Sequence, residues 1–251
     1  MAASKKPRRV SIRPLENIGS EVEERYTMFD VIHGKMTEKI VLQRLIVIAQ
    51  LPHDADRTEL GAHYEKLNIE LGKQYKWDAM TGLLLIYPSY LFHVIESSRD
   101  VLVSVLKDLK DMQQQRDCTL LGASKVVLMT HDPHSKMFQQ WSYKVLEADL
   151  VAQGRGAKGL QEEGKSTETL VCTVLSALQR LSTHLELSKK ALPGSVLDET
   201  PELIISQAIL EELLARDELQ SPQQYLQMYS SPLHITMDFG QAIRSSCLTT
   251  V

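Results

Sequence analysis

The stretch "MTGLLLIYPSYLFHVIES", Met80 to Ser97, decides the fold of this chain. Two apolar runs, "GLLLIY" and "LFHVIES", flank the tripeptide "PSY". Pro88 favours a turn there, because proline presets the backbone for a turn and cannot donate to a strand ladder. We therefore predict two antiparallel strands joined by a tight turn, and ask whether they line a ligand site or only a core.

The segments before and after the hairpin differ in the spacing of their apolar residues. "KIVLQRLIVIAQL", Lys39 to Leu51, is rich in Val, Ile and Leu, as is typical of a buried strand. A helical stripe follows and predicts a helix that begins near Asp56. "RDVLVSVLKDLKDMQQQ", after the hairpin, predicts a second amphipathic helix. The first stripe consists of Leu60, Tyr64, Leu67 and Leu71, and the second of Leu102, Val105, Leu106 and Leu109.

Two further strands are predicted before residue 150, in "TLLGASKVVLMTH" and "FQQWSYKVLEA". The element order is then β-α-β-β-α-β-β, which favours an α+β fold with a ferredoxin-like mixed sheet. Right-handed crossovers would place both helices on one face of that sheet. The other face is expected to stay available.

Composition changes divide the chain into four predicted parts. Residues 1–38 carry a run of basic residues without an apolar period and are predicted to be a flexible tail, in which "RRVS" makes Ser11 a candidate phosphorylation site. A sheet domain spans 39–150, and a Gly-rich charged linker spans 151–168. Residues 169–251 are predicted to be a helical C-terminal extension.

The extension contains two predicted helices, separated by a break at "LPGSVLDETP". The second, within Leu203 to Leu219, is acidic, which indicates either a solvated face or docking against a basic partner. "LHITMDF" predicts a short closing strand. The first helix has its stripe at Leu170, Val174, Leu178, Leu181 and Leu185, and the second at Ile205, Ile209 and Leu213.

The bulk composition excludes several classes of protein. A net charge of -4 over 251 residues gives no basic footprint for nucleic acid outside the first residues. Three widely spaced cysteines favour neither a disulfide framework nor a zinc site. No apolar run reaches the length of a membrane span, and no secretory signal is recognisable. We expect a cytoplasmic protein.

The hairpin and its neighbours resemble the BLUF family, flavin-binding blue-light sensors built on a ferredoxin-like sheet with two helices. "MTGLLLIY" and "HVIES" match the family's "ITGLLLY" and "QVLEG", and "RLIVIA" at Arg44 to Ala49 matches its first strand. "FQQWSY" stands where the family has "F-x-x-W-S-M". The resemblance covers residues 39–150 and identifies that part as a BLUF-like domain.

The residues that carry BLUF photochemistry are replaced. The resemblance puts Val47 where the family has an electron-donating tyrosine, and His93 where it has a glutamine that rearranges its hydrogen bonds. The family's flavin-binding asparagine falls at Tyr75, and Trp141 would line the pocket. We therefore expect a vestigial pocket at Val47, Tyr75, His93 and Trp141, with no catalytic residue and no cofactor, although a flavin is the ligand to test.

The whole chain also resembles an animal family of testis-expressed proteins, which implies expression in male germ cells and a place in the axoneme of a cilium or flagellum. The leading hypothesis is a non-enzymatic interaction module with protein partners in a cytoskeletal assembly. The alternative is a flavin or other small-molecule sensor that uses a modified pocket. An enzyme with an unrecognised site is a third hypothesis, and its mark would be ionisable side chains clustered in a cleft.

One further motif could bind a metal. "HDPH", His131 to His134, has two imidazoles around Asp132, but Pro133 favours a turn and no further ligands follow at a suitable spacing. We therefore predict exposed turn histidines and no metal site.

Overall fold

The computed structural model describes residues 41–76, 78–114, 121–153, 165–188 and 193–229, all within one compact unit. The predicted tail with Ser11 lies outside the described residues, as does the predicted closing strand at 233–239. So does the glycine-rich part of the predicted linker, residues 154–164.

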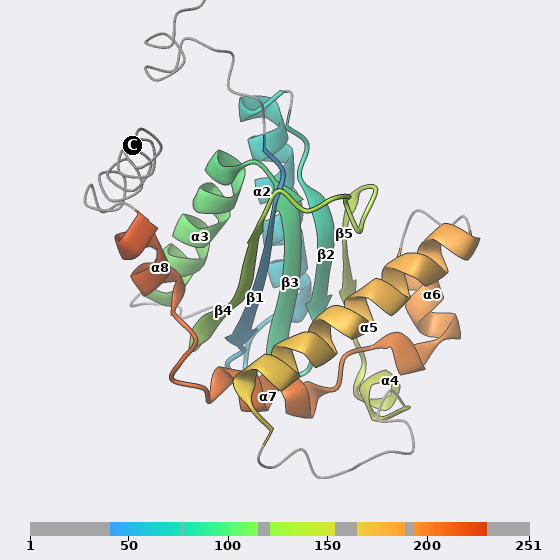
Figure 1. The fold of residues 1–251 in the computed structure, drawn as a ribbon. Coiled ribbons are helices and arrows are strands. Elements are labelled where there is room, and N and C mark those ends of the chain that lie inside the picture. The colour runs from blue at the N-terminus through green and yellow to red at the C-terminus, as the bar shows by residue number, and fades with distance from the viewer. Residues whose placement is uncertain (1–40, 77, 115–120, 154–164, 189–192, 230–251) are drawn as a thin grey trace, which may run out of the picture. The chain divides into compact units, whose positions relative to one another are not determined.

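The described residues form one mixed sheet whose five strands run in the order β4-β1-β3-β2-β5 (Figure 1). β1 pairs antiparallel with β3 and β4, β2 pairs antiparallel with β3, and β5 adds to β2 in parallel. The predicted hairpin, element order and α+β ferredoxin-like arrangement are confirmed. The strands are β1 Gln43–Gln50, β2 Thr81–Ile86, β3 Tyr90–Ser97, β4 Ser124–His131 and β5 Trp141–Val145.

Two helices cover one face of the sheet, as predicted. They are α2, Arg57–Gln74, and α3, Arg99–Gln114, and their apolar stripes pack on the side chains of alternate strand residues. Asp56 begins α2, because its carboxylate accepts hydrogen bonds from the backbone N–H groups of Thr58 and Glu59 at 2.8 and 3.1 Å. The strand residues on this face are Leu45, Val47, Ala49, Leu84, Ile86, Leu91 and Ile95.

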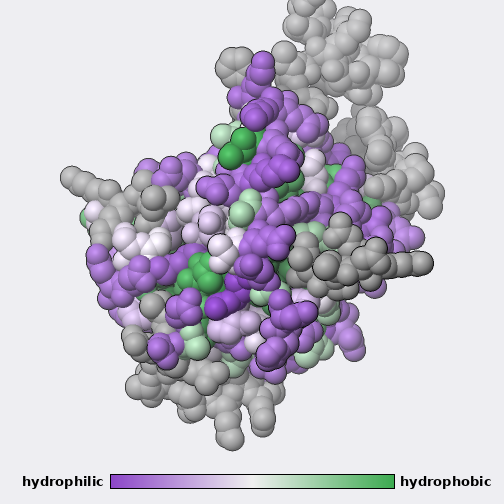
Figure 2. All heavy atoms as spheres, turned by 180° about the vertical axis from the view of Figure 1, so that it is seen from behind, coloured by the Kyte–Doolittle hydropathy of each residue, from purple (hydrophilic) through white to green (hydrophobic). Residues whose placement is uncertain are grey.

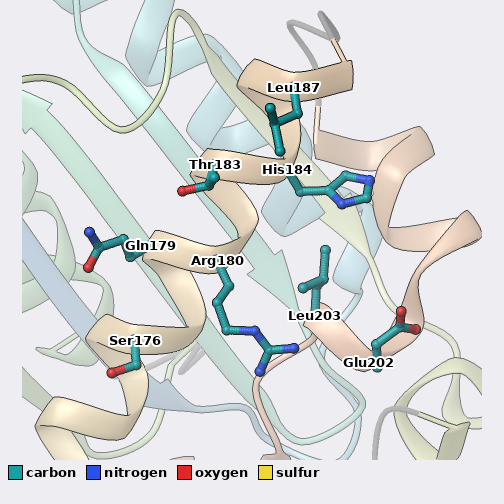
Figure 3. A pocket seen from close by; sticks show the side chains of 8 residues that line it. All are labelled: Ser176, Gln179, Arg180, Thr183, His184, Leu187, Glu202 and Leu203. Atoms are coloured by element: carbon teal, nitrogen blue, oxygen red, sulfur yellow. The ribbon is translucent and has the colours of Figure 1, made fainter.

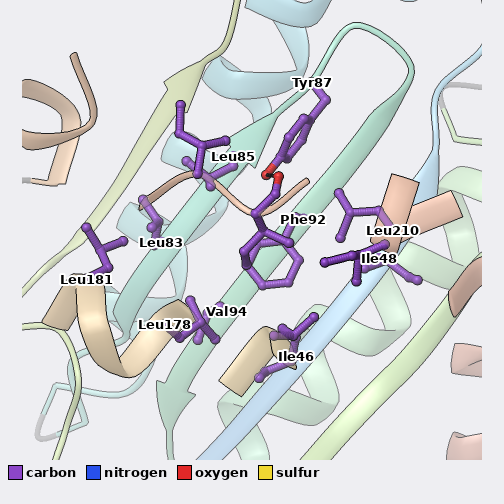
Figure 4. Packing of buried hydrophobic residues seen from close by; sticks show 14 of the residues in the cluster. Ile46, Ile48, Leu83, Leu85, Tyr87, Phe92, Val94, Leu178, Leu181 and Leu210 are labelled. Atoms are coloured by element: carbon purple, nitrogen blue, oxygen red, sulfur yellow. Dashed lines mark hydrogen bonds between the residues drawn. The ribbon is translucent and has the colours of Figure 1, made fainter. Parts of the chain in front are cut away.

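The opposite face is not available, so that expectation was wrong. α5, Thr167–Ser188, and α7, Gln207–Leu214, cover it and share one apolar core with it (Figures 1 and 4). The physical reason lies in the strands, which are apolar on both faces and would otherwise expose a large hydrophobic surface. The strand residues of this core are Ile46, Ile48, Leu83, Leu85, Phe92 and Val94.

Several short elements differ from the prediction. "PGSVLDE", expected to be a break, forms α6, Pro193–Glu199, because proline is tolerated at the first helical position. The acidic helix expected within 203–219 is limited to the short α7 and is preceded by the 3-10 turn η1, Pro201–Leu203. Two helices were not predicted: α4, Ala148–Gln153, and α8, Pro222–Tyr229.

Gly82 is required by the backbone of the hairpin. Its φ is +149°, and a Cβ placed there would lie 2.0 Å from the carbonyl oxygen of Val94 on β3. Only glycine is free of both the conformational strain and the clash. The glycine of the "MTGLLLIY" motif is therefore a structural requirement of the β2–β3 pairing.

A buried ion pair fixes the loop before β5. Glu96 on β3 is fully buried and accepts a hydrogen bond from the Arg44 guanidinium on β1 at 2.7 Å. Its carboxylate also accepts the backbone N–H groups of Met137 and Phe138, at 2.9 and 3.1 Å. Glu96 thereby anchors the loop that positions Trp141 at the start of β5.

Candidate functional site

The predicted pocket is centred on His93, in the middle of the sheet. His93 on β3 stands directly opposite Val47 on β1 and opposite Leu84 on β2. All three side chains face the α2/α3 side and have no solvent exposure. Val47 and His93 are therefore neighbours, as the alignment with the BLUF motifs requires.

Trp141 is hydrogen-bonded to this histidine. The indole Nε1–H of Trp141 donates to Nε2 of His93 at 3.0 Å, which brings β5 to the site. Burial lowers the pKa of His93 to about 3, so the ring is neutral at physiological pH. Because Nε2 accepts, we assign the single ring proton to Nδ1, which is buried and has no hydrogen-bond partner.

Tyr64 of α2 completes the cluster. Its ring packs edge-on against His93, with centroids 5.0 Å apart and an interplanar angle of 74°. Burial raises the pKa of Tyr64 well above its ordinary value, so the phenol stays protonated. Its hydroxyl is also buried without a partner. Two donors, the Tyr64 O–H and the His93 Nδ1–H, thus lie in one apolar cluster without an acceptor.

A bridge between α2 and α3 closes the cluster on its outer side. His63 Nε2 lies 3.0 Å from a carboxylate oxygen of Asp108, and the His63 ring also packs edge-on against Tyr64. The hydrogen bond with Asp108 raises the pKa of His63, although partial burial opposes it. The two helices are therefore joined directly above Tyr64.

Tyr75, the fourth predicted residue, packs against the same apolar cluster as Trp141. It caps the C-terminus of α2, where its backbone N–H donates to the carbonyl of Leu71 at 2.8 Å. Its hydroxyl accepts a hydrogen bond from the neighbouring Gln74 at 3.3 Å. No hydrogen bond or ring contact joins Tyr75 to His93 in the part of the chain that the structure describes.

The site does not fit a flavin. Val47, Leu84, His93 and Tyr64 have zero exposure, so none of these side chains borders a space large enough for a water molecule. α2 also approaches β5 closely, since a Cβ at Gly61 would lie 2.4 Å from the ring of Tyr143. The two unpartnered donors would suit a ring carbonyl, but side chains occupy the space that a flavin ring would need.

Three residues of this cluster were not predicted from the sequence. Tyr64 was predicted only as one position of an apolar helical stripe, although its hydroxyl could have indicated a buried polar group. His63 and Asp108 are 45 residues apart on different helices, so nothing in their local sequence connects them. Only the packing of α2 beside α3 brings them together.

Polar residues predominate on the outer surface of the α2/α3 side of the molecule (Figure 2).

His131 of the "HDPH" turn stacks on Tyr229 of α8, with ring centroids 6.4 Å apart. The described residues contain no group of three or more His, Cys, Asp or Glu side chains that could hold a metal ion. None of the helices that the structure describes is long and apolar enough to cross a membrane.

Comparison with known proteins gives one family and several solved structures. The family model described as testis-expressed protein 47 matches residues 41–231, about three quarters of the chain.

The solved structures include BlrB, a BLUF protein in its dark state, with 12% identity, a TM-score of 0.35 and coverage of 53% of this chain and 97% of BlrB. Klebsiella pneumoniae BlrP1, in a calcium and cyclic diGMP complex, is 19% identical with a TM-score of 0.33 and covers 42% of this chain. A bacterial light-regulated adenylyl cyclase is 16% identical with a TM-score of 0.34; the match covers 59% of this chain and 36% of the cyclase.

BLUF proteins are thus among the structural neighbours, but the match spans only 24% of the length of BlrP1. At these TM-scores none of the three supports an inference about activity.

Proposed function

Since this chain belongs to the family of testis-expressed protein 47, we propose that it is a non-enzymatic BLUF-like interaction module in a sperm flagellar assembly. Its photochemistry is lost, because Val47 offers no phenol to a flavin and His93 offers a ring in place of an amide. The domain then serves as a rigid scaffold, and its surfaces make the functional contacts.

The observation that carries this proposal is the filled site around His93. A light sensor needs a flavin in van der Waals contact with its reactive side chains. Here the ring of Tyr64 and the indole of Trp141 contact His93 instead, and the ring of His63 packs against Tyr64. A closed cluster favours a structural role over a ligand-dependent one.

The loss of photochemistry is tested by absorption spectroscopy. The purified full chain, incubated with an excess of FMN or FAD and then desalted, should be colourless above 400 nm. Retention of a stoichiometric blue-absorbing flavin would contradict the proposal. His93→Gln should still bind no flavin, because the closed packing of Tyr64 remains.

A place in the flagellum is supported by the testis-expressed family and by the predicted basic tail and acidic helix, which offer opposite charges to partners. The test is fractionation of sperm. The protein should stay with the detergent-extracted axoneme and leave it at high salt. Quantitative recovery in the detergent-soluble fraction would contradict the proposal.

A small-molecule sensor is the second candidate, and the unpartnered donors of Tyr64 and His93 favour it. A ligand with a carbonyl acceptor would satisfy both donors, but α2 would first have to move away from α3. His63→Ala should then raise the affinity for such a ligand, since it removes the bridge. If His63→Ala binds as little flavin as the wild type does, the interaction module remains the proposed function.

A further inference from the structure

A surface groove lies between α5 and η1, on the outer side of the helical layer (Figure 3). Its volume is about 580 Å³. One wall is the outward side of α5 and the other is formed by η1. The lining residues are Ser176, Gln179, Arg180, Thr183, His184, Leu187, Glu202 and Leu203.

The two walls carry opposite charges that have no partner. Arg180 projects from α5 and Glu202 from η1, and neither forms an ion pair in the described part of the chain (Figure 3). Two ion pairs on the same side of the sheet contrast with these two residues. Arg216 pairs with Glu212, and Lys144 with Asp198 at 2.7 Å. Among the residues that the structure describes, the groove therefore has a cation, Arg180, and an anion, Glu202, on facing walls without an ion pair.

The groove also has an apolar end. Leu187, in the last turn of α5, is 80% exposed, while Leu203 forms an almost buried part of the floor. Thr183 has a short side chain, so another backbone could approach α5 closely between Arg180 and Leu187.

We propose that a second copy of this chain occupies the groove, and that two copies pair about a two-fold axis through their α5 helices. Such an axis places each surface against itself, so the interface must be self-complementary. Arg180 of each copy would face Glu202 of the other, and the interface would contain this ion pair twice. The exposed Leu187 side chains would be covered in the same contact. A dimer goes beyond the proposed function and does not depend on the flavin.

A second copy fits the groove better than an acidic or a basic partner. A strongly acidic segment would meet Glu202, and a strongly basic one would meet Arg180, so each would bring like charges together. Only a partner with both charges at matching positions satisfies both walls, and an identical chain has them by construction. α5 is also long, since its 22 residues span roughly 33 Å, enough for a standard-sized interface.

Charge exchange tests this interface. Sedimentation velocity of the full chain between about 1 and 100 μM should show a monomer–dimer equilibrium. Arg180→Glu and Glu202→Arg should each weaken the dimer at least about tenfold, because like charges then face each other twice. An equimolar mixture of the two variants should form a heterodimer as tight as the wild-type dimer, since every facing pair is again opposite.

The mixture also serves as the folding control, because a misfolded variant could not restore association. Lys73→Glu, on the exposed side of α2, is the matched charge control and should leave the dimer unchanged. The proposal is overturned if the wild type is a monomer throughout this range. It is also overturned if neither single variant changes the dissociation constant of the dimer, or if the mixture of the two variants fails to associate.

Discussion

The two faces of the sheet bury their polar groups differently. On the α5/α7 face, the Tyr87 hydroxyl donates to the carbonyl of Ile205 at 2.8 Å, and Glu96 accepts hydrogen bonds from Arg44, Met137 and Phe138. On the α2/α3 face, the Tyr64 hydroxyl and His93 Nδ1 have no partner. An unsatisfied buried donor costs about 1–3 kcal/mol, so Tyr64 and His93 each carry a penalty that Tyr87 and Glu96 do not. Ser142 Oγ, Thr167 Oγ1 and Arg216 Nε on the α5/α7 side are also buried without a partner, so the contrast concerns these four residues and not each face as a whole.

The contrast indicates where function is to be sought. Tyr87 and Glu96 are covered by segments that satisfy them, namely the Ile205 carbonyl and the donors of Arg44 and the loop before β5. Tyr64 and His93 keep two buried donors that a carbonyl acceptor would satisfy. Five measurements can break or sharpen this comparison.

The largest effect is expected for Glu96→Ala on the α5/α7 face. The substitution leaves the Arg44 charge buried and unpaired and removes the acceptor of two backbone N–H groups. We expect a loss of about 4 kcal/mol in the free energy of unfolding, measured by urea denaturation. Glu147→Ala is the control, because its pair with Arg57 is 3.7 Å long and exposed, and it should cost less than about 1 kcal/mol.

Leu178→Ala tests whether α5 packs on the sheet. Leu178 is 1% exposed and packs in the same core as Val94, so its truncation should cost about 3 kcal/mol in urea denaturation. Cys172 on the same helix is exposed and lies outside the proposed dimer contact, so Cys172→Ala should change stability by less than about 0.5 kcal/mol. Equal effects of the two substitutions would mean that α5 does not pack on the sheet.

His93 should make stability depend on pH. Its folded pKa of about 3 lies below the ordinary 6.5, so between these values the unfolded chain binds a proton that the folded chain does not. Stability therefore falls as pH falls below 6.5, by about 1.4 kcal/mol per pH unit and about 2 kcal/mol at pH 5. His93→Phe should lose this part of the slope. The prediction fails if wild type and variant have parallel profiles.

A pair of tyrosine substitutions compares the faces directly. Tyr87→Phe removes a hydrogen bond to a buried carbonyl and should cost about 1.5 kcal/mol. Tyr64→Phe removes a hydroxyl that has no partner and should be neutral or slightly stabilising. A substantial loss for Tyr64→Phe would mean that its hydroxyl is satisfied in solution, which would remove the difference between the faces.

The smallest effect concerns the His63–Asp108 bridge. The pKa of His63 is raised, so its contribution is fully present below pH 6.5 and is lost as pH rises through the raised value. His63→Asn should therefore cost less than about 1 kcal/mol at pH 6 and less still at pH 9, since the pair is partly exposed. A cost that grows with pH would contradict the assigned ion pair.

Much of the sheet could be predicted from local patterns. Val, Ile and Leu runs gave the strands, and apolar stripes gave α2, α3 and α5, because burial imposes a fixed period on each kind of element. The helix start at Asp56 was predictable from its side-chain chemistry. α6 was not, since "PG" favours a break locally and tertiary contacts of Val196 and Leu197 decide the helix.

The amino-acid sequence by itself determined the order of helices and strands in the sheet domain, the hairpin at Met80 to Ser97, and the departures from the BLUF motifs at Val47 and His93. These depend on local preference, on periodicity and on residue identity. Only the tertiary structure decided that α5 and α7 close the second face, that His63 meets Asp108, and that Arg180 and Glu202 face each other unpaired. These are contacts between distant segments, which depend on how helices pack and have no local signature in the chain.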